Sequence, residues 1–172
     1  MRAEIIKLHQ RIDTTFVYVT HDQTEAMTLG DRIVIMKDGW IQQIGTPQEV
    51  FDHPGNVFVA GFIGMPQMNL FNAKLVRVEG GYNVEVGAAQ IPVGEGIAKG
   101  LEDKGYGSMD VLAGIRPEHI VLKAEGADVT RGKVDVSEMM GSEIHLHIDA
   151  TGKDVVVRVP TVDLEESNRG GF

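Results

Sequence analysis

Residues 15–25 read Thr-Phe-Val-Tyr-Val-Thr-His-Asp-Gln-Thr-Glu, and the structural pattern changes at the histidine in the middle of this stretch. The β-branched and aromatic residues before His21 predict a buried strand over residues 15–20. Asp22 can cap a helix, and Glu25 stands three residues further on, where its side chain can reach back to the cap. Open α/β sheets place their ligands where a buried strand gives way to a helix. His21 is therefore a candidate site residue.

The pattern around this stretch remains a mixture of helix and strand up to residue 63. Thr46-Pro47 with Glu49 is a strong helix start, because it supplies a cap, a proline at the first helical position and a returning glutamate. The elements predicted besides residues 15–25 are a helix over 2–12, strands over 32–37 and 40–44 about an Asp38-Gly39 turn, a helix from Thr46 to His53, and a helix from Asn56 to Phe62.

The chain changes character near Gly64, after which short strands alternate with turns. This spacing of strands is typical of a small barrel or sandwich. We therefore predict two domains, residues 1–63 and 64–172. The predicted strands are 69–78, 82–86, 90–93, 110–115, 120–123, 131–137, 143–149 and 154–159, with one helix over 95–104.

Composition excludes several classes of protein. The chain has 172 residues with 16 basic and 25 acidic side chains, a net charge of −9, which argues against a protein whose main task is to bind nucleic acid. There are no cysteines, so disulfides, thiolate metal sites and cysteine nucleophiles are all excluded. No apolar run of about 18 residues is present, and charges throughout residues 1–11 do not fit a signal peptide.

Residues 19–33, together with Met36-Lys-Asp-Gly39 and Gly45-Thr-Pro-Gln-Glu-Val50, resemble the end of the nucleotide-binding domain of ATP-binding cassette (ABC) importer ATPases. The resemblance is strongest to the carbohydrate-uptake type, the maltose and glycerol-phosphate importer subunits. Gly114-Ile-Arg-Pro-Glu-His-Ile120 and Glu138-Met-Met-Gly-Ser-Glu143 are similar to signatures of that subfamily's C-terminal regulatory domain. The resemblance implies an α+β chain: an α/β remnant of an ABC ATPase domain, then an all-β barrel domain similar to the oligonucleotide/oligosaccharide-binding (OB) fold.

The same resemblance implies a function. The parent protein would hydrolyse ATP with Mg²⁺ to energise sugar uptake, and His21 would be its switch histidine, which holds the γ-phosphate and the attacking water. Its partners would be a second copy of the subunit, the membrane permease subunits and a regulatory protein, with no nucleic acid. The protein would be cytoplasmic and peripheral on the inner face of the cell membrane.

The phosphate-binding loop of such ATPases is not in this sequence. A phosphate loop needs Gly, four residues, Gly-Lys and then Ser or Thr, and neither Gly132-Lys133 nor Gly152-Lys153 fits. The sequence resembles a fragment that begins after the last dimer-facing loop of the ATPase core and stops before the family's last strands. We expect no cofactor-binding residue and no activity in the chain alone. The alternative is a non-catalytic regulatory or dimerisation module that binds a partner protein or a small anion.

Five other candidate residues have plainer interpretations. Asp22 and Gln23 are expected to cap the helix and to lie in solvent. His145 and His147 face the same side of a strand and could hold a metal, but no third ligand has matching spacing, so we expect solvated side chains and no metal site. Arg116 precedes Pro117 in a sharp turn, where it could pair with Glu118 or contact a ligand. We expect the structural turn.

Overall fold

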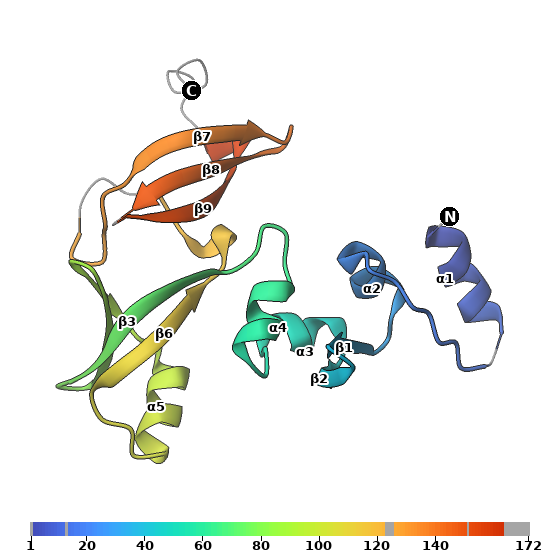
Figure 1. The fold of residues 1–172 in the computed structure, drawn as a ribbon, viewed down its shortest axis with the longest axis horizontal. Helices are drawn as coiled ribbons and strands as arrows, with labels where there is room; N and C mark the ends of the chain where they lie inside the picture. The colour runs from blue at the N-terminus through green and yellow to red at the C-terminus, as the bar shows by residue number, and fades with distance from the viewer. Residues whose placement is uncertain (1, 13, 123–125, 151, 164–172) are drawn as a thin grey trace. The chain divides into compact units, whose positions relative to one another are not determined.

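The computed structural model describes residues 2–12, 14–122, 126–150 and 152–163. The chain divides into two compact units, Met1–Gln67 and Met68–Phe172, and each has a hydrophobic core of its own (Figure 1). Helices and antiparallel sheets make up both, which confirms the α+β prediction. Within the described ranges, no helix is long and apolar enough to cross a membrane.

The first unit contains four helices and one hairpin among its described residues, and they follow the predicted order. Thr46 and Glu49 form the full capping box at the start of the third helix, and Asn56 caps the fourth. These elements are α1 (Arg2–Arg11), α2 (Gln23–Leu29), β1 (Ile33–Lys37), β2 (Trp40–Gly45), α3 (Pro47–Asp52) and α4 (Val57–Phe62).

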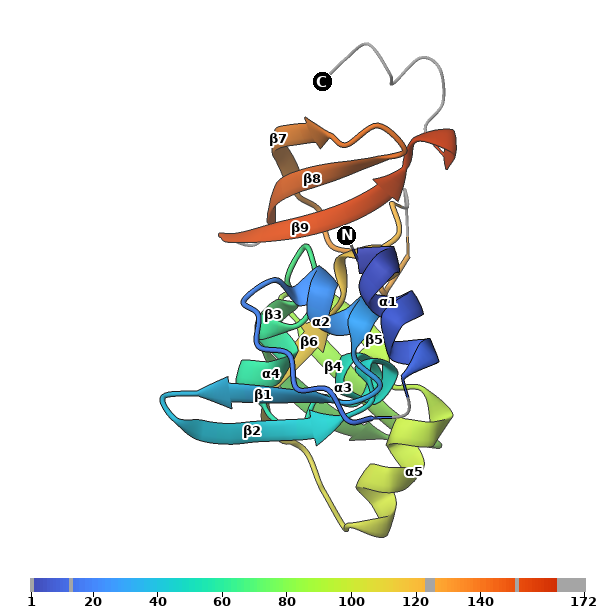
Figure 2. The ribbon, with the colours of Figure 1, turned by 90° about the vertical axis from the view of Figure 1, so that its right-hand side faces the viewer.

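Strands β1 and β2 run side by side as an antiparallel hairpin (Figure 2). Asp38 has φ 51° and Gly39 has φ 81°, the two positive values that a type I′ turn needs. Alternate residues of β1 face the core, which gathers side chains from the hairpin and from the two helices that follow it. The buried core residues are Ile33, Ile35, Val50, Val59 and Ile63.

The predicted strand over residues 15–20 is wrong, because this segment has no regular secondary structure. Val17 and Val19 are 89% and 90% exposed, and Phe16 and Tyr18 are about half exposed. A buried strand exists only where neighbouring strands hydrogen-bond to it and layers cover both faces. Among the described residues no strand pairs with this segment, so its β propensity alone does not make it a strand.

The second unit is built from two antiparallel sheets, and the short helix η1 lies in the connection between them (Figure 1). The first sheet has the order β5-β4-β3-β6, and the second has the order β7-β8-β9. The elements are β3 (Asn69–Val78), β4 (Gly81–Val86), β5 (Ala89–Pro92), α5 (Glu95–Asp103), β6 (Met109–Ile115), η1 (Pro117–His119), β7 (Lys133–Met139), β8 (Glu143–Ala150), β9 (Lys153–Pro160) and η2 (Thr161–Asp163).

The core of this unit is one face of the second sheet. Leu146 and Val157 are each 1% exposed and are register partners on β8 and β9. Asn69 of β3 joins the first sheet to this core: its side-chain amide donates to the Val156 carbonyl at 2.8 Å and accepts the Val156 N–H at 2.9 Å. One buried side chain thus satisfies both backbone groups of a residue on the edge strand β9.

The predicted strand over residues 120–123 is also wrong. Pro117 opens the short helix η1, and Ile120 to Leu122 continue without regular structure, while Lys123 lies outside the described residues. Ile120 instead packs its side chain against the core of β8 and β9. Ile120 is thus a buried residue of a loop. A short apolar run in the sequence does not tell a buried loop of this kind from a strand.

Candidate functional site

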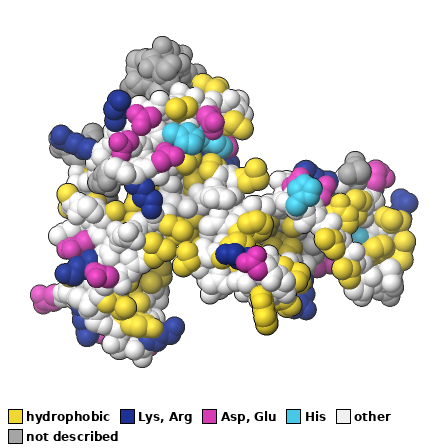
Figure 3. Space-filling view, viewed as in Figure 1, with side chains coloured by type: hydrophobic (Ala, Val, Ile, Leu, Met, Phe, Trp, Pro, Cys, Tyr) yellow, Lys and Arg dark blue, Asp and Glu magenta, His cyan; other side chains and the backbone are white. Residues whose placement is uncertain are grey.

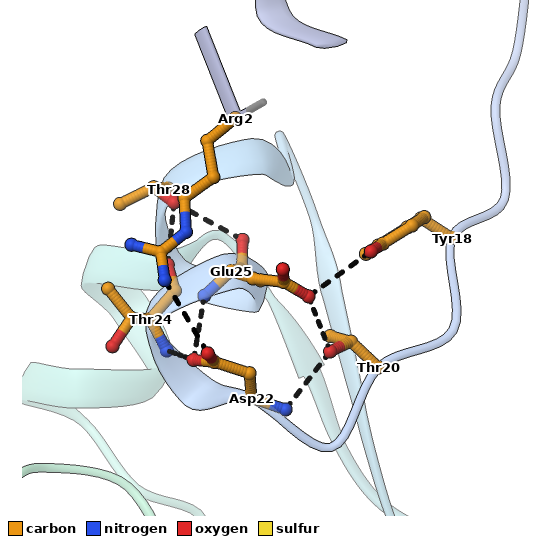
Figure 4. Close-up of polar contacts among 7 residues, drawn as sticks. All are labelled: Arg2, Tyr18, Thr20, Asp22, Thr24, Glu25 and Thr28. Atoms are coloured by element: carbon orange, nitrogen blue, oxygen red, sulfur yellow. Dashed lines mark hydrogen bonds and ion pairs between the residues drawn. The ribbon is translucent and has the colours of Figure 1, made fainter.

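His21 lies in a tight turn between an irregular segment and α2. The backbone N–H of Asp22 donates to Oγ1 of Thr20 at 3.0 Å, which closes a ring around His21. Asp22 then caps α2, because its Oδ1 accepts the N–H groups of Thr24 at 2.7 Å and Glu25 at 3.2 Å (Figure 4). The residues on both sides of His21 are therefore held by hydrogen bonds, as local turn chemistry favours for Thr and Asp.

The sequence predicted that the side chain of Glu25 reaches back to the cap, but Glu25 binds other groups. Its Oε2 accepts the Thr20 hydroxyl at 2.7 Å and the Tyr18 hydroxyl at 3.2 Å, as Figure 4 shows. The Asp22 N–H, which a capping box would pair with Glu25, is already taken by Thr20. The hydrogen bond to Glu25 and the charge of that carboxylate raise the pKa of Tyr18. The capping prediction for Asp22 is confirmed, and that for Glu25 is wrong.

Gln23 has a role that sequence reasoning missed. Its Nε2 donates to the Phe62 carbonyl at 2.5 Å, and its Oε1 accepts the N–H of Gly64 at 3.1 Å. The first residue of α2 is thus tied to the end of α4 by both ends of one amide. No local signal reveals this bridge, because the partners lie 39 and 41 residues away.

The imidazole of His21 is exposed, and within the described residues no hydrogen bond or ion pair to it is formed. A neutral imidazole offers one N–H donor and one acceptor, and a protonated one offers two donors. Such a group can donate to a phosphate oxygen or hold a water in line for attack. The arrangement therefore presents a free imidazole on a backbone that is fixed on both sides.

The Asp22 carboxylate makes the helix start sensitive to acid. The hydrogen bond from the Glu25 N–H is the largest cause that lowers its pKa, with contributions from Thr24 and Arg2. A lowered pKa in the folded state means stability that is present above the ordinary carboxyl pKa and is lost as the pH falls through the folded value. The Arg2 guanidinium lies 3.5 Å from Oδ2 of Asp22. Because Arg2 is exposed to water, this ion pair adds little to the stability of the helix start.

We expect the hydrogen-exchange protection of the Thr24 and Glu25 amides to begin to fall below the ordinary aspartate pKa of about 4 and to be lost as the pH falls through the lower pKa of folded Asp22. Asp22→Asn is the matched control, because an asparagine cap accepts the same bonds without titrating. Carboxyl NMR titration of Asp22 measures the pKa directly. A midpoint at or above the ordinary aspartate value would contradict this expectation.

His145 and His147 lie on the same face of the second sheet, but they contact different carboxylates. Nε2 of His145 is 2.9 Å from Oε1 of Glu143, whose other oxygen binds Arg158. His147 lies 3.5 Å from both Asp154 and Glu138. Figure 3 shows histidine side chains among acidic ones over this sheet.

The expectation of solvated histidines is therefore wrong for His145, whose side chain is only 12% exposed. The hydrogen bond from His145 is the main cause that lowers the pKa of Glu143, and Arg158 adds to it. Across the described part of the chain, no group of three His, Cys, Asp or Glu side chains is arranged to hold a metal ion. These histidines contact neighbouring carboxylates on a sheet face.

Arg116 forms the predicted turn, since it directly precedes η1, in which Pro117 is the first residue. Arg116 is only 4% exposed, which the sequence did not indicate. A buried guanidinium needs partners that satisfy its donors. The burial supports a structural position for Arg116.

Known domains and proteins are similar to this chain along most of its length. The MalK OB fold domain matches residues 64–120, and the TOBE domain matches residues 113–169. The oligosaccharides import ATP-binding protein MsmX of Bacillus subtilis is 49% identical over 164 residues, which cover 92% of this chain and 44% of that protein.

Two further relatives agree with this match. The multiple sugar-binding transport ATP-binding protein MsmK of Streptococcus mutans is 44% identical and covers 96% of this chain and 47% of its own length. The sn-glycerol-3-phosphate import ATP-binding protein UgpC of Chromobacterium violaceum is 39% identical and covers 92% of this chain and 41% of its own length. The chain thus spans less than half the length of these relatives. Over nearly its whole length the chain is similar to part of sugar, oligosaccharide and glycerol-phosphate import ATP-binding proteins, and it carries the MalK OB fold and TOBE domains.

Proposed function

We propose that this chain is part of the ATP-hydrolysing subunit of an ABC importer for sugars, and that His21 is its switch histidine. The observation that carries the proposal is the exposed imidazole of His21 on a backbone anchored at Thr20 and Asp22. In that role His21 donates to a γ-phosphate oxygen and holds the attacking water in line. Both contacts strengthen as charge develops on the transferred group, so they accelerate hydrolysis more than they aid binding.

ATP and Mg²⁺ would be bound mainly by other parts of the parent protein. Triphosphate affinity comes from a backbone cradle, its lysine and a metal held by Ser or Thr and Asp. The sequence has no such loop, and no metal-binding group forms among the described residues. The contribution of this chain is therefore a group that acts on the reacting phosphate, without the cradle that holds the nucleotide.

We expect the chain alone to lack micromolar affinity for Mg-ATP. His21 by itself offers one hydrogen bond, worth only about 0.5–1.5 kcal/mol net. Isothermal titration calorimetry with Mg-ATP checks this, with inorganic phosphate as a control for weak anion binding. Micromolar affinity, or phosphate release above the uncatalysed background, would show that groups other than His21 bind the nucleotide in this chain.

A chimaera tests the proposed function directly. Residues 1–172 replace the matching segment of MsmX, which supplies the rest of an importer subunit. We expect the chimaera to hydrolyse ATP and to restore oligosaccharide uptake in a strain that lacks MsmX. In this setting we also expect residues 15–20 to pair as a strand, because neighbouring strands are then available. A folded chimaera with no ATPase activity would contradict the proposal.

We also propose the partners of such a subunit: a second copy of itself, the membrane permease subunits and a regulatory protein. The matches to the MalK OB fold and TOBE domains support a regulatory role for residues 64–169. The same observation favours the second candidate, a regulatory or dimerisation module without catalysis. His21→Ala in the chimaera of residues 1–172 separates the two, because a module without a catalytic role does not make the ATPase rate depend on His21.

A further inference from the structure

The hydroxyl of Thr20 makes two hydrogen bonds that together enclose His21. Oγ1 accepts the Asp22 N–H at 3.0 Å and donates its own proton to Oε2 of Glu25 at 2.7 Å. The first bond closes the turn whose middle residue is His21. The second bond anchors that turn on α2. We call Thr20, His21 and Asp22, closed by this bond, the Thr20 turn.

Glu25 binds residues on both sides of His21. Its carboxylate accepts hydrogen bonds from the hydroxyls of Tyr18 and Thr20, which precede His21 in the chain. Its backbone N–H donates to the side chain of Asp22, which follows His21. Figure 4 shows the hydroxyls of Tyr18 and Thr20 pointing to the same carboxylate oxygen of Glu25. The half-buried position of Thr20 protects its bond to Glu25 from competition by water.

Gln23 fixes the other side of the same helix start. Its amide holds the Phe62 carbonyl and the Gly64 N–H, so the first residue of α2 cannot shift along the body of the unit without breaking both bonds. The Thr20 turn therefore stands on a fixed base. The side chain of His21 is the only one in the turn without a hydrogen bond among the described residues.

We propose that Thr20 is a positioning residue for His21: its hydroxyl, anchored by Glu25, fixes the backbone from which the imidazole meets the γ-phosphate. The proposal rests on the switch role of His21 given above. A misplacement of about 1 Å in such a group can lower the rate by about 100-fold. Thr20 never touches the nucleotide and acts only through the orientation of His21.

The conservative pair of variants is Thr20→Val and Thr20→Ser. Valine has the shape of threonine but neither donates nor accepts, so both bonds are lost. Serine keeps the hydroxyl and restores them. Thr28→Val is the matched control. Thr28 lies in α2, and its hydroxyl donates only to backbone carbonyls of that helix, at 2.6 Å to Thr24.

Hydrogen exchange and ¹⁵N relaxation of the 172-residue chain are the first readout. In Thr20→Val we expect faster exchange of the Asp22 amide by about tenfold and an order parameter of His21 that falls from about 0.85 toward 0.6. We expect Thr20→Ser and Thr28→Val to match the unmodified chain. An unchanged His21 order parameter in Thr20→Val overturns the proposal, as does an equal change in Thr28→Val.

Hydrolysis by the MsmX chimaera is the second readout. We expect Thr20→Val to lower kcat by about 10- to 100-fold with little change in KM for ATP, and Thr20→Ser to restore it. If His21→Ala is inactive while Thr20→Val hydrolyses at the normal rate, only the positioning proposal fails. If His21→Ala itself hydrolyses normally, the switch role fails, and the relaxation data then show only that Thr20 orders the turn.

Discussion

His21→Ala in the MsmX chimaera is expected to lower the turnover of ATP by about 100- to 1000-fold, the usual cost of removing one preorganised group that stabilises a transition state. The imidazole has no other hydrogen bond among the described residues, so its loss leaves no buried group unpaired. The fold and the affinity for ATP should therefore be retained. Steady-state phosphate release gives the turnover, and ATP binding measured on the same preparation gives the affinity.

His53→Ala is the matched control for this experiment. It is also an exposed histidine of the first unit, but it lies at the end of α3, where only its backbone takes part in the cap. We expect His53→Ala to hydrolyse ATP like the unmodified chimaera. A His21→Ala variant with a near-normal rate would show that His21 is only a turn residue.

Asn69→Ala is expected to destabilise the second unit by about 2–6 kcal/mol, because it leaves two backbone groups of Val156 without a partner at about 1–3 kcal/mol each. Asn69 is 7% exposed, so water has little room to replace its amide. The NMR signals of β8 during a urea titration report the free energy of unfolding of this unit alone, since the two units need not unfold together.

Asn72→Ala controls for the substitution itself. Asn72 lies on the same strand β3, is exposed, and its side chain makes no hydrogen bond among the described residues. We expect the substitution to change the free energy of unfolding by no more than about 0.5 kcal/mol. Equal effects of Asn69→Ala and Asn72→Ala would mean that the bridge to Val156 contributes nothing to stability.

Local elements follow from the sequence wherever the partner of a residue lies a few positions away. Thr46 and Glu49 form both bonds of their capping box, with the Thr46 N–H donating to Glu49 at 2.8 Å. Asp38 and Gly39 adopt the hairpin turn that their residue types favour. In both cases the deciding interaction is contained in the stretch that predicts it.

The predictions from the sequence are wrong where a competing or distant partner determines which contact forms. Glu25 binds Thr20 and Tyr18 because the Thr20 hydroxyl has already taken the Asp22 N–H. Residues 15–20 have the composition of a strand but no neighbouring strand among the described residues. Pairing is a property of two segments, so one segment cannot reveal it.

The candidate site shows the same division. The position of His21 and the cap at Asp22 follow from local pattern and from family resemblance, while the bridge of Gln23 to Phe62 and Gly64 does not. His145 contacts Glu143, which in turn binds Arg158 from the neighbouring strand. Long-range polar contacts of this kind leave no periodic signal in the sequence.

Trapping by orthovanadate tests the central claim most directly, because ADP with vanadate mimics the transferred phosphoryl group in its transition state rather than bound ATP. We predict that the unmodified chimaera retains labelled nucleotide after incubation with Mg-ATP and vanadate. The His21→Ala variant should bind ATP with similar affinity but retain at least about 100-fold less nucleotide at equal vanadate, in line with the loss of one transition-state contact. Equal trapping by the two proteins would contradict the assignment of His21 to the reacting phosphate.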